Sequence, residues 1–287
     1  MLKYLLPNFI NAQLLIVYAV WEEALKELLR RVAKGELSVD DAEKLLRTSA
    51  IQEIDNLAKL DVNRESRKGV PEIILGDGKT PEDLAKITLR MLSENGRAIV
   101  SRVDMQGIGA IREAVPKDAI LEVNDKIGML VIKKTDFHVK KTGGKIGLLT
   151  AGTSDIPVAE EARIVAEEMG CEVISAYDVG VAGIHRLFTH LRNIIEREVN
   201  SIVVVAGREG ALPAVVAGIV NVPVIAVPTS VGYGLGEKGI SALTAMLQAC
   251  SLGLAVVNID GGVAAGAIAA LIANQVAEAK GASKYQP

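Results

Sequence analysis

The C-terminal half of the chain alternates five short apolar runs with segments of helical periodicity. Apolar residues, mostly Val, Ile, Leu and Ala, fill consecutive positions of these runs, which is typical of strands buried on both faces of a parallel sheet. Helices are expected after the runs, because a parallel connection must cross back over the sheet. The expected strands are 146–150, 173–176, 202–206, 224–227 and 254–259, and the expected helices are 158–169, 184–199, 212–219, 240–249 and 264–279.

The distribution of charge along the chain supports the same fold. Residues 21–100 carry 30 charged side chains, whereas residues 201–280 carry only seven. Ionised groups are rarely buried without partners, so the second region is expected to lie mostly inside a doubly covered sheet or an oligomer. The first strand is not followed by Gly-x-Gly-x-x-Gly, and five strand–helix units of this kind favour a flavodoxin-like sheet. The predicted fold class is therefore α/β.

The N-terminal part is expected to hold a smaller module over residues 22–135. Residues 22–59 have helical periodicity, with a cap at Gly35 and a second helix opening at Ser38. Residues 63–68 are polar and are interpreted as a connector. The expected elements that follow are a strand at 71–75, a helix from Thr80-Pro81 to Gly96, a strand at 97–103, a short helix at 109–114 and one or two strands at 120–134. A lysine-rich linker at 133–144 then leads to a second domain at 145–280.

Residues 1–21 are apolar and raise the question of a membrane segment or signal peptide. Pro7 and Asn8 interrupt the run, and its cleanest stretch, 12–21, is about half of the ~20 residues that a membrane span needs. No small-residue cleavage pattern follows. We interpret this segment as an N-terminal helix or extension and expect a cytoplasmic protein that binds no membrane.

Composition excludes several classes of protein. Lys+Arg 32 against Asp+Glu 35 gives a net charge of −3, which argues against a nucleic-acid-binding protein. Two cysteines form no disulfide framework in a chain of this length. The three histidines and two distant cysteines also lack the spacing of a zinc site.

Polar residues of the second domain gather in the loops that follow the strands, where ligands of such sheets bind. The loop after the first strand places Gly152, Thr153 and Ser154 at a helix start, which favours anion binding; the alternative is that these residues and Asp155 only cap the helix. Loop 229–234 combines glycines, hydroxyls and one aromatic ring, which is typical of a lid over a ligand. An ordinary flexible connection between strand and helix could have the same composition.

Charged residues and cysteines of this half also allow two interpretations each. Arg208-Glu209 is either a surface pair or a cleft pair in which Glu209 acts as a general acid or base. His185-Arg186 begins a helix and either binds an anion or packs at an interface. Cys171 and Cys250 are by default small apolar residues, and no histidine or cation near Cys250 in the sequence lowers its pKa.

The C-terminal half resembles the PurE family of aminoimidazole ribonucleotide mutases and carboxylases. The matching segments are 152–158 (GTSDIPV), 206–213 (AGREGALP) and 222–228 (VPVIAVP). A closer resemblance is to the LarB family, which has this fold and takes part in the biosynthesis of the nickel-pincer cofactor. It rests on 177–187 (YDVGVAGIHRL), 228–234 (PTSVGYG), 256–262 (VVNIDGG), 69–72 (GVPE) and 78–82 (GKTPE).

The resemblance implies that the chain carboxylates C5 of the pyridinium ring of nicotinic acid adenine dinucleotide and hydrolyses the phosphoanhydride. The products are pyridinium-3,5-biscarboxylic acid mononucleotide and AMP. The family's cysteine falls on Cys250 and its catalytic glutamate on Glu209. CO2 or bicarbonate is the co-substrate, no cofactor is tightly bound, and Mg²⁺ would be held by Asp155, Asp178 or Glu209. The substrate-binding residues implied are Gly152, Thr153, Ser154, Asp155, Asp178, His185, Arg186, Arg208, Thr229, Ser230 and Tyr233.

Two alternatives remain beside this interpretation. The chain departs from PurE at Tyr177, where that family has a histidine, and at Cys250, where it has a proline, which disfavours an aminoimidazole ribonucleotide carboxylase. A non-catalytic nucleotide-binding protein would need Cys250 to be dispensable. The lid is also more charged at 235–238 than expected of LarB.

The position of Cys250 predicts an assembly. It precedes a strand and so lies near the amino edge of the sheet, while the phosphate loops lie at the carboxyl edge. A five-residue strand is about 17 Å long, which is too far for one site within one subunit. We therefore expect a homo-oligomer, built from dimers, in which Cys250 meets the loops of a neighbour.

Overall fold

The computed structural model forms two compact units, 1–67 and 68–287. Within them it describes residues 26, 29–46, 52–54, 58–61 and 64–283. The expectation for residues 1–21 lies outside the described residues.

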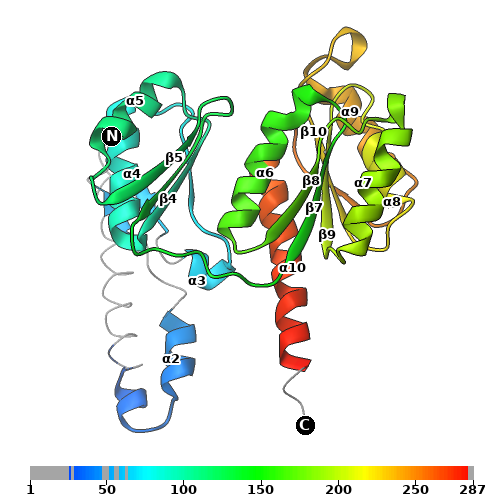
Figure 1. Cartoon of the computed structure of the whole chain (residues 1–287). Coiled ribbons are helices and arrows are strands. Elements are labelled where there is room, and N and C mark those ends of the chain that lie inside the picture. The colour runs from blue at the N-terminus through cyan, green and yellow to red at the C-terminus, as the bar shows by residue number, and fades with distance from the viewer. Residues whose placement is uncertain (1–25, 27–28, 47–51, 55–57, 62–63, 284–287) are drawn as a thin grey trace, which may run out of the picture. The chain divides into compact units, whose positions relative to one another are not determined.

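The larger sheet of the second unit has five parallel strands in the order β11-β10-β9-β7-β8 (Figure 1). This is the strand order of a flavodoxin-like sheet, so the predicted fold class is confirmed. The strands are β7 (Lys145–Thr150), β8 (Glu172–Ala176), β9 (Ser201–Ala206), β10 (Val224–Pro228) and β11 (Leu254–Val256), and the helices are α6 (Ile156–Glu168), α7 (His185–Glu196), α8 (Leu212–Ala217), α9 (Ile240–Leu247) and α10 (Gly262–Ser283). Among these strands only β11, expected over 254–259, is markedly shorter than expected, and it ends at Val256.

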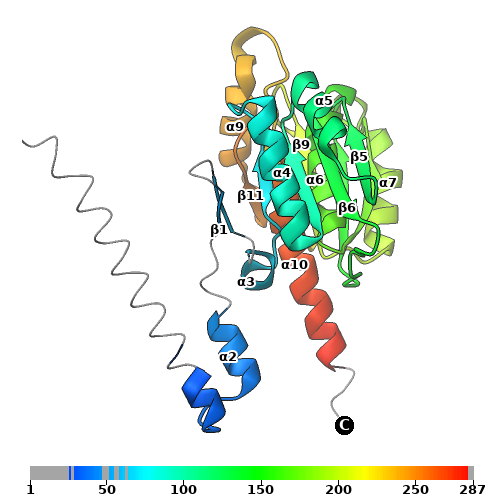
Figure 2. The ribbon, with the colours of Figure 1, turned by 90° about the vertical axis from the view of Figure 1, so that its left-hand side faces the viewer.

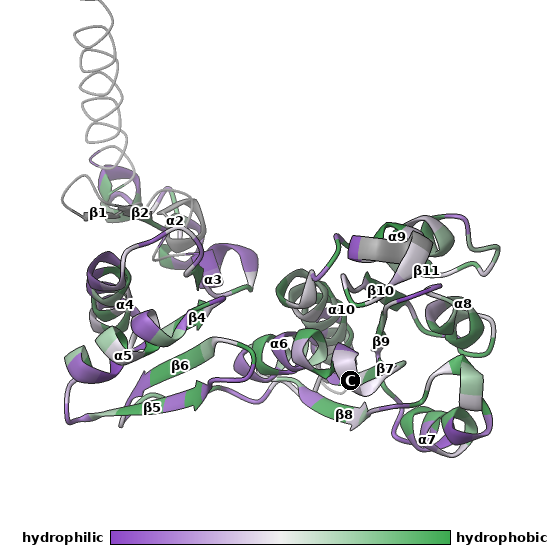
Figure 3. Ribbon diagram, turned by 90° about the horizontal axis from the view of Figure 1, so that it is seen from above, coloured by the Kyte–Doolittle hydropathy of each residue, from purple (hydrophilic) through white to green (hydrophobic). Residues whose placement is uncertain are grey.

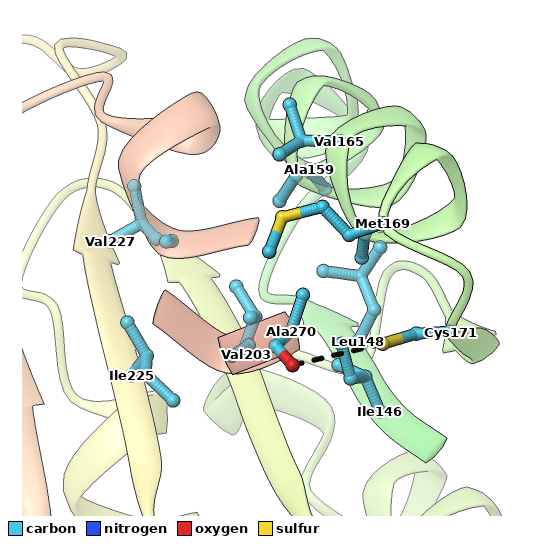
Figure 4. Close-up of a cluster of buried hydrophobic side chains, with 14 of the residues drawn as sticks. Ile146, Leu148, Ala159, Val165, Met169, Cys171, Val203, Ile225, Val227 and Ala270 are labelled. Carbon is cyan, nitrogen blue, oxygen red and sulfur yellow. Dashed lines mark hydrogen bonds between the residues drawn. The ribbon is translucent and has the colours of Figure 1, made fainter. Parts of the chain in front are cut away.

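Each face of this sheet has its own apolar core. Successive residues of a strand point to opposite faces: Val203 and Ile225 pack with α6 and α10 (Figure 4), whereas Val204 and Ala226 pack with α7, α8 and α9. Helices on both faces leave little room for charge inside, which explains the scarcity of charged residues between 201 and 280. The polar loops consequently gather at the carboxyl edge of the strands.

The smaller sheet of the second unit has the strand order β3-β4-β6-β5; α4 packs against it, and α5 packs against α4 (Figure 2). Helix α4 begins and ends where the sequence predicts: Thr80 Oγ1 accepts a hydrogen bond from Asp83 N, and Gly96 has a left-handed φ of 70°. The elements are β3 (Ile73–Leu75), α4 (Pro81–Asn95), β4 (Arg97–Ser101), α5 (Met105–Ala114), β5 (Ala119–Asn124) and β6 (Met129–Lys134). Helix α5 starts earlier than expected because Asp104 caps it through the Gly107 N–H.

The first unit corrects two expectations. Helix α2 (Val39–Leu46) opens after Ser38, whose Oγ accepts from Asp41 N at 3.0 Å, as predicted. The helical interpretation of 22–59 is nevertheless wrong beyond α2, since β1 (Gln52–Ile54) and β2 (Ala58–Leu60) pair as an antiparallel ladder. Strands this short are stabilised by each other rather than by a local pattern. The expected connector at 63–68 contains a one-turn helix, α3 (Arg64–Lys68), with Glu65 favourably placed in its first turn.

Helix α6 lies between the two sheets of the second unit (Figure 3). Its alanines pack in one core with residues of both sheets, including Ile99 and Val131 of the smaller one. Buried charges join the same surfaces: Glu168 of α6 accepts from Arg97 at 3.1 Å and pairs with Lys133 at 2.6 Å. The two sheets therefore share apolar and ionic contacts through one helix.

Helix α10 is the one helix among the described residues that is long and apolar enough to cross a membrane, over Gly262–Gly281. One third of that window is buried inside the protein, and α10 packs against α6 and the larger sheet. A core helix of a soluble α/β fold passes the same test of length and composition. Location in the cytoplasm stays a prediction.

Candidate functional site

A pocket of about 520 Å³ lies at the carboxyl edge of the larger sheet. Three loops surround it, those that follow β7, β8 and β9, and Val231 from the loop after β10 adds to the rim. This is where ligands of flavodoxin-like sheets bind. Of the residues predicted from the sequence, the pocket is lined by Gly152, Ser154, Asp155, Asp178, Arg186, Arg208 and Glu209.

The loops around the pocket are held in conformations that side chains seldom adopt. Asp178 and Arg208 have φ values of 58° and 50°, in the left-handed region, which costs a non-glycine residue about 1 kcal/mol. Close approach also requires two glycines: a Cβ on Gly180 would lie 2.6 Å from the Ala151 carbonyl oxygen, and one on Gly207 would lie 2.5 Å from that of Val231. Backbone conformations of this kind persist only where the surrounding structure stabilises them, and they are frequent at ligand-binding sites.

Asp155 is the buried acid of the pocket, with only 4% of its surface exposed. Its Oδ1 accepts from Thr229 Oγ1 at 2.7 Å, and its Oδ2 accepts from Gly152 N at 2.8 Å. Burial raises the pKa of Asp155 even though these hydrogen bonds favour the ionised form. Asp155 therefore ties two loops together, and its side chain makes no capping hydrogen bond at the start of α6.

Two arginines give the pocket its positive charge. Arg186 of α7 donates to Asp178 Oδ2 at 2.5 Å, so part of its charge is neutralised. Arg208 lies over the Tyr233 ring, 4.4 Å from its centroid, and Tyr233 raises the pKa of Arg208, which stays charged. The Glu209 carboxylate follows Arg208 directly and lines the pocket. The arrangement surrounds the pocket with two arginines and a carboxylate.

The remaining predicted residues lie around the pocket or away from it. Thr153 is exposed in the turn before α6, and His185 is exposed at the start of α7. Thr229 and Ser230 hold the loop after β10, through Asp155 and through a hydrogen bond from Ser230 N to Asp260 Oδ1 at 2.8 Å. Tyr233 is 75% exposed and touches the site only through Arg208.

The two cysteines have opposite environments. Cys171 is completely buried in the core (Figure 4), and burial raises its pKa to about 11. Cys250 is exposed and lies after α9, before the amino end of β11. It is not among the residues that line the pocket, which agrees with the separation that the sequence predicts.

Within the described part of the chain, no three His, Cys, Asp or Glu side chains gather as metal ligands. Asp155 is engaged by Thr229 and Gly152, and Asp178 by Arg186. Asp155, Asp178 and Glu209, the candidates for Mg²⁺, therefore do not form a three-residue ligand cluster in the described part of the chain.

Sequence reasoning places the loop of Asp260 at this edge of the sheet but gives Asp260 no role in the site, and it does not include Arg102. Asp260 binds the loop after β10, and Arg102 donates to the Asp260 carbonyl oxygen at 3.1 Å. Asp260 carried a signal, since it is one of the few charges in the C-terminal half. Arg102 carried none, because its partner lies 158 residues away in the chain.

Comparison with known proteins finds two adjacent domains. Residues 51–134 match the family model described as the LarB/PurE-like N-terminal domain. Residues 145–284 match the model described as AIR carboxylase. Together the two matches reproduce a LarB architecture over most of the chain.

Individual relatives fall into two groups. An uncharacterized protein of Methanocaldococcus jannaschii is 48% identical over 251 residues, which cover 87% of this chain and 96% of that protein. N5-carboxyaminoimidazole ribonucleotide mutases are more distant and match a smaller share of the chain. The mutase of Thermotoga maritima is 30% identical over 36% of this chain and 59% of its own length, and that of M. jannaschii is 31% identical over 41% and 71%.

Proposed function

The chain belongs to the LarB family, whose PurE-like domains indicate a carboxylase-type enzyme, and from this premise we propose that it carboxylates nicotinic acid adenine dinucleotide. The proposed products are pyridinium-3,5-biscarboxylic acid mononucleotide and AMP, so that the enzyme also hydrolyses the phosphoanhydride. This would be the first step of nickel-pincer cofactor synthesis. The observation that carries the proposal is the pairing of a phosphate-type pocket with an exposed cysteine that PurE proteins lack.

The pocket supports a nucleotide with a pyrophosphate. Arg186 and Arg208 supply positive charge, and the loop at 152–155, which lines the pocket, leads into the start of α6, where the helix dipole favours a bound anion. The apolar residues Val181, Ala182 and Leu212 line the same space, and would pack against a ring or ribose. A volume of about 520 Å³ holds a large part of a dinucleotide, and its open rim leaves room for the remainder.

The chemistry needs a nucleophile because a pyridinium ring is electron-poor and does not attack CO2. The Cys250 thiolate adds to C4, and the ring nitrogen receives the electron pair, which gives a neutral dihydropyridine. This enamine attacks CO2 from C5 and forms the new carbon–carbon bond. Glu209 then removes the C5 proton, the C4–sulfur bond breaks, and the thiolate leaves as aromaticity returns. No oxidant or reductant is consumed.

Hydrolysis needs only water as a second reactant. Water adds to the phosphorus on the nicotinate side, the phosphoanhydride P–O bond breaks, and AMP leaves as a phosphate monoester. Arg208 and Arg186 would stabilise the negative charge that develops on the phosphate oxygens. Glu209 lines the pocket beside Arg208 and would also accept the proton of the attacking water.

We further propose that each site forms between subunits. Cys250 lies at the amino side of β11 and the pocket at the carboxyl edge, so the thiolate of one subunit would reach the pocket of its neighbour. The side chains around Cys250 fit an interface: Leu247 is 64% exposed and Leu252 is 92% exposed. Apolar residues exposed to this degree beside a nucleophile are typical of a surface that a partner covers.

The decisive experiment incubates the purified protein with nicotinic acid adenine dinucleotide and bicarbonate and identifies the products by mass spectrometry. AMP is expected, together with a product that is heavier than nicotinic acid mononucleotide by the mass of one CO2. Cys250→Ser should abolish the carboxylated product, and Glu209→Gln should lower its rate by about a hundredfold or more. The matched control is Cys171→Ala, which removes the buried thiol and should keep the activity.

Three outcomes would overturn the proposal. Conversion of aminoimidazole ribonucleotide, with no reaction of the dinucleotide, would assign the chain to the purine branch of its relatives. Full activity of Cys250→Ser would remove the covalent step. Absence of AMP at every bicarbonate concentration tested would equally exclude the reaction.

A mixing experiment tests the shared site. Subunits with Cys250→Ser and subunits with Glu209→Gln are each expected to be inactive, and refolding them together should restore activity at the sites that combine the two intact residues. A statistical mixture of dimers recovers at most about one quarter of the wild-type sites. No recovery in hybrids whose mixing is verified by native mass spectrometry contradicts an intersubunit site.

A further inference from the structure

Arg102 stands at the carboxyl end of β4, outside the region that matches the AIR carboxylase model. Its φ of 56° is left-handed, and this backbone conformation turns the chain sharply after the strand. The guanidinium donates to the Asp260 carbonyl oxygen at 3.1 Å and lies 3.7 Å from Asp77. A residue of the smaller sheet thus contacts the loop that precedes α10.

Ser101, the neighbour of Arg102, makes a second contact at the same place. Its hydroxyl donates to Glu161 Oε1 at 3.1 Å, and both side chains are buried. Glu161 also accepts a backbone hydrogen bond from Val263. The end of β4 therefore reaches both ends of the short segment 260–263, once directly and once through Glu161.

Asp260 connects the end of β4 to the loop after β10. Its own φ is 55°, and it binds the loop after β10 twice: Asp260 N donates to the Pro228 carbonyl oxygen at 2.9 Å, and Asp260 Oδ1 accepts from Ser230 N at 2.8 Å. The backbone and the side chain of one residue thus hold residues 228 and 230 of that loop.

The same loop forms part of the pocket. Thr229 is completely buried and donates to Asp155. The Val231 carbonyl oxygen accepts from Arg208 N at 3.3 Å, and Val231 lines the pocket. A continuous series of hydrogen bonds therefore runs from Arg102 through Asp260 and Ser230 to the rim of the pocket.

We propose that Arg102 and Asp260 are positioning residues that hold the loop at 228–234 in its substrate-binding conformation. The smaller sheet would thereby contribute to nucleotide binding without touching the nucleotide. The consequence for catalysis rests on the proposed function. The positioning of the loop does not, because it is a property of the substrate-free protein. Holding the loop in advance reduces the ordering that substrate binding would otherwise require.

The physical character of the Arg102 contact makes the expected effect local. The side chain is 43% exposed, and exposed pairs contribute little to global stability. Arg102→Ala should therefore leave the thermal midpoint close to that of the wild type while it releases the loop. Lys126→Ala is the matched control, because Lys126 lines the same small cavity as Arg102 and carries the same charge.

Hydrogen exchange of the substrate-free protein measures the loop directly. In Arg102→Ala, peptides that span 228–234 should exchange about fivefold faster or more, while peptides from α4 remain unchanged. Lys126→Ala should exchange as the wild type does, and Arg102→Lys should restore part of the protection. Equal exchange of the loop in Arg102→Ala and Lys126→Ala overturns the proposal.

Two substitutions at Asp260 separate positioning from simple turn geometry. Glycine adopts a positive φ without strain but removes the acceptor for Ser230 N, whereas asparagine tolerates this φ and keeps an acceptor oxygen. Asp260→Gly should release the loop as Arg102→Ala does, and Asp260→Asn should retain most of the protection. If the loop is protected equally in both variants, the carboxylate does not position it.

The kinetic test separates this inference from the proposed function. With nicotinic acid adenine dinucleotide, Arg102→Ala should raise KM by roughly fivefold and change kcat less, because the lost free energy is spent on ordering the loop during binding. If the wild type does not use this substrate, the proposed function fails while the exchange result stands. If exchange rises but KM is unchanged, the loop does not contribute to binding and the positioning role is excluded.

Discussion

The two cysteines show how strongly position controls a thiol. Cys171 lies among the core residues beneath α6 and α10, where its Sγ faces Asn274 Oδ1 at 3.1 Å. Burial raises its pKa from 9.0 to about 11, because the thiolate would lose its hydration. Cys250 is exposed. The sequence alone treats both as small apolar residues; burial distinguishes them.

Alkylation checks this difference. A Cys250→Ala protein keeps only Cys171, and in the native state at pH 8 iodoacetamide should modify it about a hundredfold more slowly than a free thiol with a pKa near 9, since the reactive thiolate is that much rarer. The rate should rise as the pH approaches 11, and unfolding in urea should expose the thiol fully. Rapid labelling of the folded protein at pH 8 would contradict the buried environment.

Glu161 predicts a pH dependence of stability. Burial raises its pKa above the ordinary 4.5, although Ser101 and Arg102 favour the ionised form; nearby Asp260 adds to the increase. The native state therefore binds the proton more tightly than the unfolded chain, and this contribution to stability is lost as the pH rises from 4.5 through the raised pKa. Glu161→Gln keeps the shape and removes the titration.

Urea unfolding of both proteins between pH 4 and pH 8 measures the effect. The free energy of unfolding of the wild type should fall relative to that of Glu161→Gln across this window. Ser101 can serve the amide as an acceptor, so the variant retains its hydrogen bond. A difference that is constant with pH, or one that grows in favour of the wild type, contradicts a raised pKa.

At the scale of elements, glycines determine how closely α10 approaches α6. A Cβ on Gly262 would lie 2.2 Å from the Val158 carbonyl oxygen, and one on Gly266 would lie 2.4 Å from that of Ala162. Both contacts are with backbone, which cannot move aside as a flexible side chain would. The spacing of four residues in each helix places both contacts on one face.

Gly266→Ala should therefore destabilise the protein by about 1–3 kcal/mol, as overpacking in a core does. Gly281→Ala is the control on the same helix: a Cβ there meets nothing within 4 Å, and the better helix propensity of alanine should stabilise by roughly 0.5–1 kcal/mol. Denaturant unfolding measures both. A stabilising Gly266→Ala would show that the helices separate freely.

Local signals account for most of what the sequence predicts. Thr80 and Gly96 delimit α4 through hydrogen bonds within a few residues, and the apolar runs of the larger sheet need no partner to be recognised. The hairpin of β1 and β2 was not recognised, because three-residue strands depend on their pairing. In the site, the loops could be located from strand ends, whereas the contact between Arg102 and Asp260 joins residues far apart in the chain and has no local signature.

At the scale of the second unit, a buried ionic cluster joins the two sheets. Arg97 and Glu168 have side chains 3% and 7% exposed, and Lys133 is 17% exposed. Arg97 also donates to the Glu168 carbonyl oxygen at 2.6 Å and lies 5.0 Å from the centre of the Phe137 ring. One carboxylate thus compensates two cations, where α6 meets the smaller sheet.

Removing the Glu168 carboxylate should lower the stability of the second unit. Glu168→Ala removes the buried carboxylate that Arg97 and Lys133 share and leaves Lys133 with only the more distant Glu122, 3.8 Å away; we expect this to lower the free energy of unfolding by about 3–5 kcal/mol. Replacing all three residues by Met should recover much of the loss, because no charge then remains buried. Denaturant unfolding, followed by tyrosine fluorescence and far-UV circular dichroism together, checks both variants. If Glu168→Ala unfolds with the wild-type midpoint, the cluster does not hold the sheets together; if the triple Met variant is no more stable than Glu168→Ala, the loss is one of packing rather than of charge compensation.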